Sequence, residues 1–505
     1  MRFSLLSALS PWRFLAPRQR LFGLAAAALL AGCAAGPDYV RPAPPPGADS
    51  PAFKESGLWQ PATPGLAAAE ASAPGGGWWK VYGDGQLDVL VEQANQASET
   101  LRQAEAQYRQ AQALVQGARA SFFPTVGLGA SAGRGRAIGN GVAAEGNSHA
   151  WALQASWEPD LWGSVRRRVE AADDNAAASA ADLAAARLAV QAAVVNNYLQ
   201  LRLADAQKAL YADTIAGYGK ALALTQAQLR AGVATRADVA LAQSTLASVQ
   251  AQAVDVDLTR RQLEHALAVL LGQAPAAFAL EPAPLAAALP MTPAGLPSEL
   301  LQRRPDIAAA ERRVAAANAQ IGVAQAAYFP NLMLSASGGY QGSGFGPWFS
   351  APDRVWALGA ALAAILFDGG ARSAQVDEAR AAFDAAAANY RQTVLAGFQE
   401  VEDNLAALGD LAQEHIAQQE AAQAAHVAER VLLAQYRAGT ATYIAVIIAQ
   451  AQALAADRAL LQVRGRQFAA SVALIKAVGG GWHVDLLAQP PLSPASESPT
   501  SHSQR

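Results

Sequence analysis

The chain contains the stretch Ala118-Arg119-Ala120-Ser121-Phe122-Phe123-Pro124, which returns about 206 residues later as Ala324-Gln325-Ala326-Ala327-Tyr328-Phe329-Pro330. Another landmark returns at nearly the same spacing, because Arg230-Ala231-Gly232-Val233-Ala234-Thr235 is repeated as Arg437-Ala438-Gly439-Thr440-Ala441-Thr442. Landmarks that keep their order and spacing over such a span indicate one unit duplicated in tandem. In each copy a helical pattern ends at Phe-Pro, since proline and the restriction on its preceding residue stop a helix.

Strand patterns follow each Phe-Pro. Apolar residues alternate with small or polar residues in four runs near 124–136, 149–158, 330–341 and 355–367. A period of two predicts strands with one apolar face and one small or polar face. Two interpretations remain open: half-buried strands of a soluble sheet, or barrel strands with a lipid face and a wet lumen face. A length of about ten residues is what a tilted membrane strand requires.

Large aromatic residues lie toward the ends of these runs, where the interface girdle of a membrane barrel would lie. These candidate membrane-interface residues are Trp151, Trp157, Tyr340 and Trp356. Four strands cannot close a barrel, because unpaired edges in hydrocarbon would each cost several kcal/mol and the smallest common barrels have about eight strands. The membrane interpretation therefore requires an oligomer, and three copies would supply twelve strands.

Two helical stretches of unusual length, 163–230 and 370–437, contain no proline. At 1.5 Å per residue each would extend for about 100 Å, so we expect them to pack side by side as a coiled-coil tube or rod. They reverse where glycine suits a left-handed position after a helix and threonine can cap the returning helix. These tip residues are Arg230, Gly232, Thr235, Arg437, Gly439 and Thr442. The returning helices run to 272 and 479.

The N-terminus carries a targeting signal, with several arginines before an apolar run from Leu21 to Ala31. The run ends in Leu30-Ala31-Gly32-Cys33, which resembles the lipobox of bacterial lipoproteins. That resemblance makes Cys33 the acylated first residue of the mature chain, whereas the alternative is a buried structural thiol. In such lipoproteins Ala34 in the next position implies sorting to the outer membrane. No later stretch reaches the roughly 20 apolar residues that a transmembrane helix requires.

The composition points away from catalysis. Apolar residues make up 52% of the chain, largely as alanine, and the net charge of -3 gives no nucleic-acid footprint. The 6 histidines show no metal-ligand spacing, and Cys33 is the only cysteine. The acidic group at Glu400, Glu402 and Asp403 is interpreted as a solvated or intersubunit helix face. We expect no catalytic residue, no metal and no cofactor beyond the lipid on Cys33, and hence a passive conduit.

Several stretches together resemble the outer membrane factor family, the TolC-like channels of tripartite efflux systems, and especially its NodT-type lipoprotein branch. They cover the mature chain to about residue 482. The matching stretches are Gly36-Pro37-Asp38-Tyr39-Val40-Arg41-Pro42, Trp78-Trp79-Lys80-Val81-Tyr82-Gly83-Asp84, Trp157-Glu158-Pro159-Asp160-Leu161-Trp162-Gly163, Leu301-Gln302-Arg303-Arg304-Pro305-Asp306-Ile307, Phe367-Asp368-Gly369-Gly370, Glu400-Val401-Glu402-Asp403-Asn404-Leu405 and Ala477-Val478-Gly479-Gly480-Gly481-Trp482.

The resemblance implies a membrane α+β fold: a homotrimer whose twelve-stranded outer-membrane barrel continues as a periplasmic α-helical barrel. It also implies docking of the helix tips with a periplasmic adaptor (membrane fusion) protein, served by an RND-type inner-membrane pump. The expected function is a passive exit duct for drugs or other small solutes in the outer membrane of a Gram-negative bacterium. Alternatives are an exit channel for type I protein secretion or metal efflux, and a structural periplasmic lipoprotein that forms no pore.

A gate is expected on the second returning helix. In the family this helix often carries an Asp and an Arg about one turn below the tip, but here Ile448 and Ala451 stand at those positions. Ile444 and Ile448 are four residues apart and share a helix face. Pointing inward in a trimer, they would form two isoleucine rings that close by dewetting. The alternative is that both simply pack between helices.

The predicted organisation has five parts. They are a signal peptide at 1–32, a lipidated extended segment at 33–76, a first repeat at 77–275 with a long helix pair at 163–272, a second repeat at 276–484 with a helix pair at 370–479, and a disordered tail at 485–505.

Overall fold

The computed structural model describes residues 35–48, 50, 52–55, 77–139, 142–285, 289–290, 297–343 and 353–485. The predicted signal peptide, Cys33 and most of the predicted C-terminal tail lie outside these residues. The chain divides into two compact units. Unit 1 comprises the N-terminal residues up to Pro42 with Gln110–Ala176 and Arg312–Ala388, and unit 2 comprises Ala43–Arg109, Ala177–Glu311 and Asn389–Arg505.

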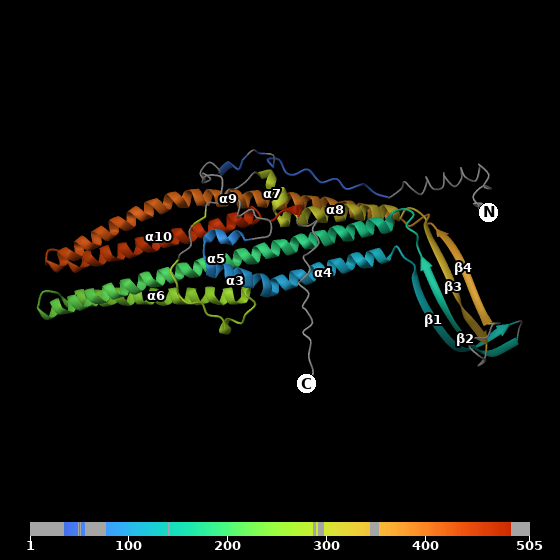
Figure 1. Cartoon of the computed structure of the whole chain (residues 1–505), viewed down its shortest axis with the longest axis horizontal. Coiled ribbons are helices and arrows are strands. Elements are labelled where there is room, and N and C mark those ends of the chain that lie inside the picture. Colours follow the sequence, from blue (N-terminus) through green and yellow to red (C-terminus); the bar gives the residue numbers. More distant parts are fainter. Residues whose placement is uncertain are drawn as a thin grey trace, which may run out of the picture. The chain divides into compact units, whose positions relative to one another are not determined.

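The elements follow one order twice (Figure 1). The first series is η2 (Trp78–Tyr82), α3 (Gly85–Ala97), α4 (Glu99–Ala120), β1 (Thr125–Gly139), β2 (Val142–Trp157), α5 (Ser164–Arg230) and α6 (Arg236–Leu270). After the 3-10 turn η3 (Pro275–Ala277), the second series runs α7 (Pro297–Arg303), α8 (Pro305–Ala326), β3 (Asn331–Ser343), β4 (Arg354–Ala363), α9 (Ala371–Arg437) and α10 (Tyr443–Ala477).

Helix lengths repeat between the two series. Helices α4 and α8 each have 22 residues, α5 and α9 each have 67, and α6 and α10 each have 35. Equal lengths in the same order are the structural form of the tandem duplication.

The helical stretch that precedes Phe123-Pro124 is interrupted. Ser98 has extended backbone angles (φ -64°, ψ 123°) and separates α3 from α4. The corresponding break in the second repeat lies at Arg304, immediately before Pro305, where the residue preceding proline is biased away from helix. Strand β4 is shorter than expected from the sequence. It ends at Ala363, and Ile365, Leu366 and Phe367 lie beyond it. Asp368 there accepts a bond from the Arg372 amide (3.2 Å) in the first turn of α9.

Unit 1 holds an antiparallel sheet of strands in the order β1-β2-β3-β4. Figure 1 shows the strands side by side in that order. The second hairpin therefore extends the first, and β1 and β4 form the two edges of the sheet.

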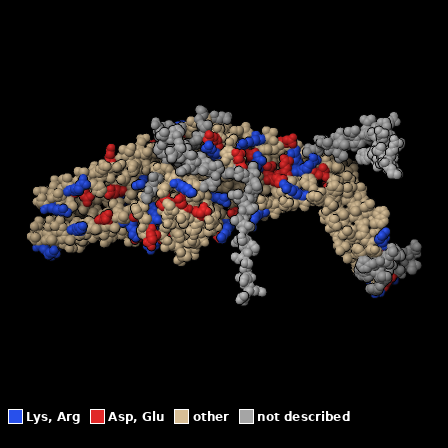
Figure 2. Space-filling model, viewed as in Figure 1, with Lys and Arg blue, Asp and Glu red and all other residues tan. Residues whose placement is uncertain are grey.

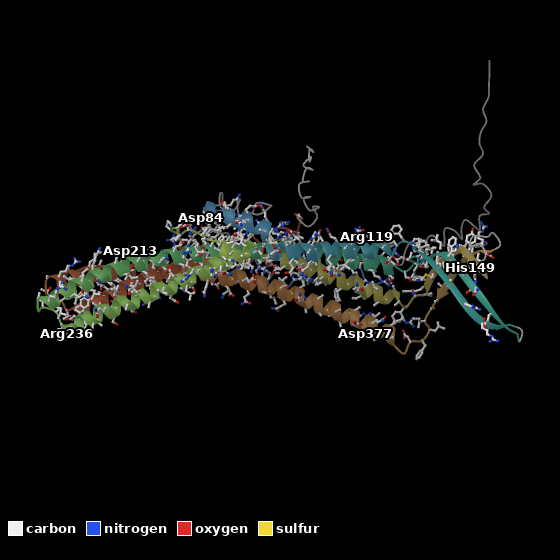
Figure 3. The ribbon with its side chains drawn as sticks, turned by 90° about the horizontal axis from the view of Figure 1, so that it is seen from below. Asp84, Arg119, His149, Asp213, Arg236 and Asp377 are labelled. Atoms are coloured by element: carbon white, nitrogen blue, oxygen red, sulfur yellow. The ribbon has the colours of Figure 1, made fainter. Side chains whose placement is uncertain are left out.

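Unit 2 holds the main cores between the long helices. One cluster joins η2 and α3 to α5 and α10 through buried residues that include Trp78, Tyr82, Tyr198 and Phe468. Smaller clusters lie farther along α5, α6, α9 and α10, around Tyr218 and Tyr443. Figure 3 labels Arg236 in the first turn of α6 at one end of this unit and Asp84, which caps α3, toward the other.

Two helices in the described part of the chain, α5 and α10, are long and apolar enough to cross a membrane by length and composition alone. The expectation that no later segment would pass such a test is wrong on this measure. Abundant Ala and Val raise the hydropathy of α5 without making an unbroken apolar run. Several of its apolar side chains, including Val194, Val195 and Leu199, are buried in the core of unit 2.

Candidate functional sites

The sheet has two chemically different faces, which its register defines. On one face Leu128 lies opposite Leu153, and Leu153 lies opposite Gly338 on β3. Apolar side chains of β4 on this face are exposed: Leu358 is 76% exposed and Leu362 is 68% exposed. Figure 2 shows the surface over the strands as almost uncharged on the side in view. An exposed apolar band of this kind is stable in lipid and unfavourable in water.

The other face is small and polar. Thr125 lies opposite Ser156, which lies opposite Ser335, and Gln154 lies opposite Ser337. The alternation expected from the sequence is thus one continuous division across all four strands. This is the division between lipid and lumen faces that a membrane barrel requires.

The four predicted interface aromatics lie on the apolar face. Trp151 and Tyr340 are paired across β2 and β3, and their rings stack at 5.2 Å between centroids with 26° between planes. Trp356 on β4 lies opposite Gly338 on β3, near the same end of the sheet as Trp151 and Tyr340. Trp157 ends β2 at the helix side, where its Nε1–H donates to the carbonyl of Phe122 (3.0 Å).

The two helix tips have nearly the same backbone. Gly232 and Gly439 both have φ 78°, and each amide donates to a carbonyl three residues back at 3.0 Å. The conformation is the left-handed helix termination that favours glycine. Arg230 and Arg437 are the last residues of α5 and α9. Helix termination therefore accounts for the glycine of the repeated Arg-Ala-Gly pattern.

The caps of the returning helices differ. Thr235 accepts from the amide of Asp238 (3.1 Å), and the Asp238 carboxylate accepts from the amide of Thr235 (2.9 Å), which completes a capping box. Thr442 makes no side-chain cap bond, and Ala445 stands at the position equivalent to Asp238. The start of α10 thus lacks a pair of bonds that the start of α6 has.

Side chains near the tips tie the two helix pairs together within unit 2. The Tyr436 hydroxyl of α9 donates to Oε1 of Gln228 on α5, and it lies 3.4 Å from the Thr225 hydroxyl. The Tyr436 and Tyr443 rings are 5.2 Å apart. Burial, followed by the charges of Tyr436 and Asp238, raises the pKa of Tyr443, and a bond from Thr225 opposes this. These residues are not among those predicted from the sequence, where their only signal is a polar group near a tip.

Ile444 and Ile448 lie on α10 with 56% and 55% of their surface exposed within the chain. Their neighbour Val446 is fully buried in the tip cluster. The two isoleucines thus share a face that the described part of the chain does not cover.

Arg304 joins three helices at the break between α7 and α8. Its guanidinium binds Glu400 (2.7 Å) on α9, Asp306 (2.7 Å) on α8 and the Ala477 carbonyl (3.0 Å) at the end of α10. Burial lowers the pKa of Arg304, but the bonds and charges of Asp306 and Glu400 outweigh burial and raise it.

The acidic group of α9 is not simply a solvated or intersubunit face, which corrects the sequence interpretation. Glu400 is held by Arg304, and the Glu402 carboxylate accepts from the amides of Lys54 (2.8 Å) and Glu55 (3.0 Å). All three partners are remote in sequence, so local charge patterning gave no sign of them.

An extended strap, residues 35–42, lies on unit 1. Buried Arg167 donates to the carbonyls of Ala35 (3.2 Å) and Gly36 (3.3 Å) and to Asp38 (3.0 Å). Gly36 and Gly322 approach so closely that a Cβ on either would overlap the other segment. The Ala35 amide donates to the Trp162 carbonyl (2.9 Å), which places the start of the strap at the junction between β2 and α5.

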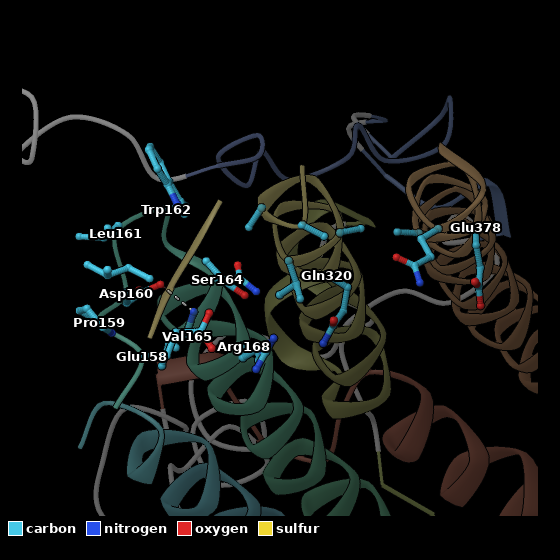
Figure 4. A pocket seen from close by; sticks show the side chains of 18 of the residues that line it. Glu158, Pro159, Asp160, Leu161, Trp162, Ser164, Val165, Arg168, Gln320 and Glu378 are labelled. Carbon is cyan, nitrogen blue, oxygen red and sulfur yellow. Dashed lines mark hydrogen bonds between the residues drawn. The ribbon is translucent and has the colours of Figure 1, made fainter. Parts of the chain in front are cut away.

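A cavity of about 530 Å³ lies where the strands meet the helices (Figure 4). Glu158 and Asn331, which follow the polar alternation of β2 and β3, line this cavity at the strand ends. Arg168 and Glu378 line it from α5 and α9. The Asp160 carboxylate at its edge accepts from the Val165 amide (3.0 Å), so this residue serves to cap α5. Among the described residues no group of three or more His, Cys, Asp or Glu is placed to hold a metal ion.

A two-faced sheet joined in duplicate to long paired helices defines a TolC-like outer-membrane channel protein. The family model "Outer membrane efflux protein" matches residues 90–273 and again 296–480. The chain belongs to the outer membrane efflux protein family. It is a non-enzymatic channel of the Gram-negative outer membrane that extends into the periplasm.

Relatives match along most of their lengths. The chain is 32% identical over 461 residues to the probable efflux pump outer membrane protein TtgC of Pseudomonas putida KT2440, covering 90% of this chain and 94% of that protein. It is 33% identical over 418 residues to the pyoverdine export outer membrane protein OpmQ of Pseudomonas aeruginosa PAO1, covering 81% and 88%.

Solved structures agree. The outer-membrane channel OprN is similar with a TM-score of 0.78 and 31% identity, covering 89% of this chain and 100% of that chain. The outer membrane protein VceC of Vibrio cholerae is similar with a TM-score of 0.75 and 31% identity, covering 81% and 100%.

Proposed function

We propose that three copies of this chain form the passive exit duct of a tripartite efflux pump. The observation that carries the proposal is the sheet, whose edge strands β1 and β4 find no partner among the described strands of one chain. Open edges in hydrocarbon leave backbone groups without hydrogen bonds, and three sheets of four strands remove every edge by closing into one barrel. The polar face bearing Thr125, Ser156 and Ser335 then lines a wet lumen.

Lipidation of Cys33 would fix this duct to the inner leaflet of the outer membrane. The strap begins two residues after Cys33, and its first described residue bonds to Trp162 at the strand-to-helix junction. Bonds from Arg167 hold the following residues. A short tether from that junction suits an acyl chain inserted beside the barrel.

The cargo is a class of small solutes. Relatives are named for antibiotic, toluene, solvent and pyoverdine efflux or export. We infer that apolar or amphipathic small molecules pass through this chain as well. Small side chains on the lumen face, such as Ser335 and Ser337, offer few specific contacts, so an RND-type inner-membrane pump selects the solute.

The tips would dock a periplasmic adaptor protein. Arg230, Gly232 and Thr235 at one tip, and Arg437, Gly439 and Thr442 at the other, are exposed or partly exposed. Just below the second tip, the open face of Ile444 and Ile448 would form the periplasmic constriction.

Two experiments test the proposal. The detergent-corrected mass of the purified lipidated protein should be that of a trimer, and a stable monomer would contradict the duct. Separately, Arg437→Ala should impair pump-dependent export in cells while trimer content stays unchanged. Arg380→Ala, an exposed residue of α9 in unit 1 with an i,i+3 partner, is the matched control. Loss of the trimer in Arg437→Ala would instead assign this residue to folding.

A further inference from the structure

The apolar face of the sheet has a gap at Gly338. In the row of side chains that crosses the sheet at this level, Leu153 and Trp356 flank it on β2 and β4. A Cβ built at Gly338 would meet no heavy atom within 4 Å. The gap opens into a hollow of about 400 Å³, here called the Gly338 slot. Its lining residues are Trp151, Gly338, Gly339, Tyr340, Arg354, Val355 and Trp356.

Aromatic rings form the walls of the Gly338 slot. The stacked pair of Trp151 and Tyr340 lies on one side, with 5.2 Å between ring centroids. Trp356, which is 72% exposed, lies on the other side. These rings come from three adjacent strands of one chain, so the slot is complete without a second copy. Flat apolar walls around a glycine floor fit a linear hydrocarbon chain.

A cation lies at the outward end of the slot. Arg354 is paired with Tyr340 across β3 and β4, so it follows the aromatic row on the same face. It is exposed and begins β4 at the end of the sheet away from the helices. Figure 2 shows basic and acidic side chains near that end of a strand surface that is elsewhere almost uncharged.

The depth of Arg354 in the membrane follows from strand geometry. Leu362 marks the helix-side end of the apolar face of β4, about eight residues from Arg354. At about 3.3 Å per residue and a tilt of about 40°, this separation spans roughly 20 Å of membrane depth. An outer-membrane barrel has an apolar band about 25 Å tall. Arg354 therefore lies near the outward boundary of the band, at the level of lipid phosphates in the outer leaflet.

We propose that the Gly338 slot binds a phosphorylated glycolipid of the outer leaflet, with one acyl chain against Gly338 and a lipid phosphate paired with Arg354. The strands cross the outer membrane with their helix ends in the periplasm, so the slot faces the leaflet in which such glycolipids are concentrated. A guanidinium matches phosphate geometry with two parallel donors. Tyr340 and the two tryptophans suit the boundary between headgroup and hydrocarbon.

Native mass spectrometry of the full-length protein, extracted from outer membranes in mild detergent, tests the assignment. Wild-type protein should retain a glycolipid adduct. Gly338→Leu, which fills the slot from the lipid side, and Arg354→Gln should each lower the adduct-bearing fraction at least fivefold. Ala360→Leu, on the same face but nearer the periplasm, and Arg134→Gln, on the same face of β1, are matched controls that should retain it.

Each other outcome decides against the slot. Wild-type protein without an adduct, or with glycerophospholipid alone, would overturn the proposal. So would both slot variants retaining wild-type levels, or Arg134→Gln losing as much lipid as Arg354→Gln, since diffuse charge would then be the cause. Far-UV circular dichroism of every variant identifies any that fails to fold. In that case purified lipid A is titrated into delipidated wild-type protein and into the slot variant that still folds. The comparison of these two titrations then decides.

Discussion

Gly479 lies directly against the backbone carbonyl of Arg303, and this contact is repeated in the first half of the chain between Gly272 and Ala97. A Cβ on either glycine would overlap the carbonyl oxygen. Both also have positive φ, 96° at Gly479 and 68° at Gly272. The end of each returning helix is therefore fixed against the break between two earlier helices by a contact that only glycine permits.

Replacing Gly479 with Ala should destabilise the protein by at least about 2 kcal/mol, since it adds a left-handed strain to a backbone overlap. Gly272→Ala should do the same. Gly217→Ala is the control, because this exposed position in α5 has nothing within 4 Å and should be neutral or slightly stabilising. The midpoint of thermal unfolding in detergent measures all three, and equal midpoints would refute the contact's importance.

Arg304→Ala should also lower the unfolding midpoint, by the equivalent of about 3 kcal/mol or more, because it leaves the Ala477 carbonyl and two carboxylates without their shared partner. The adjacent Arg303→Ala removes only a half-exposed pair with Glu299 and should cost less than about 1 kcal/mol. A comparable loss for both variants would mean that general charge, not the three-helix connection, matters.

Two buried tyrosines should respond in opposite ways to loss of the hydroxyl. The Tyr218 hydroxyl is buried with no hydrogen-bond partner among the described residues, so Tyr218→Phe should be neutral or stabilising by up to about 1 kcal/mol. The Tyr198 hydroxyl donates to Asp84 (2.7 Å), which also caps α3, so Tyr198→Phe should cost about 1.5 to 3 kcal/mol. Chemical denaturation at neutral pH distinguishes them, and a destabilised Tyr218→Phe would contradict the burial argument.

Alkaline pH gives a second test of Tyr218. Burial, then the charges of Glu429 and Tyr443, raises its pKa from 10.0 to about 12. As pH rises, the Tyr218 hydroxyl loses its proton in the unfolded chain before it does so in the folded chain. The contribution of Tyr218 to folding stability is therefore fully present below pH 10.0 and is lost as pH rises toward about 12. Tyr218→Phe should show a shallower decline over this window. Identical pH profiles for variant and wild type would show that this hydroxyl does not titrate with folding.

Serine at Ile444 and Ile448 should raise single-channel conductance of the purified protein in planar bilayers, since a hydrated constriction cannot close by dewetting. Ile416→Ser provides the control, because this residue is also exposed (61%) but lies far from the tip along α9. Unchanged conductance in the double variant would reject the gate and leave these isoleucines as packing residues between copies.

Local patterns predicted most of the fold because they repeat within a few residues. The alternation around Leu128 and Ser335 gave the two faces of the sheet, and Phe123-Pro124 gave the end of a helix. The break at Ser98 and the roles of Glu400 and Glu402 were not predictable in this way. They depend on partners such as Lys54, 348 residues from Glu402, which only the folded chain brings together.

The caps at Thr235 and Thr442 differ, so the two returning helices of the duplicated chain differ in how easily their first turns open. An N-terminal cap contributes about 0.5 to 2 kcal/mol, so the first turn of α10 frays at lower cost than that of α6. Two hairpins that began as copies thus retain one backbone while differing in stiffness. The start of α10 lacks both bonds of the capping box, because Thr442 makes no side-chain cap bond and Ala445 has no carboxylate to return one.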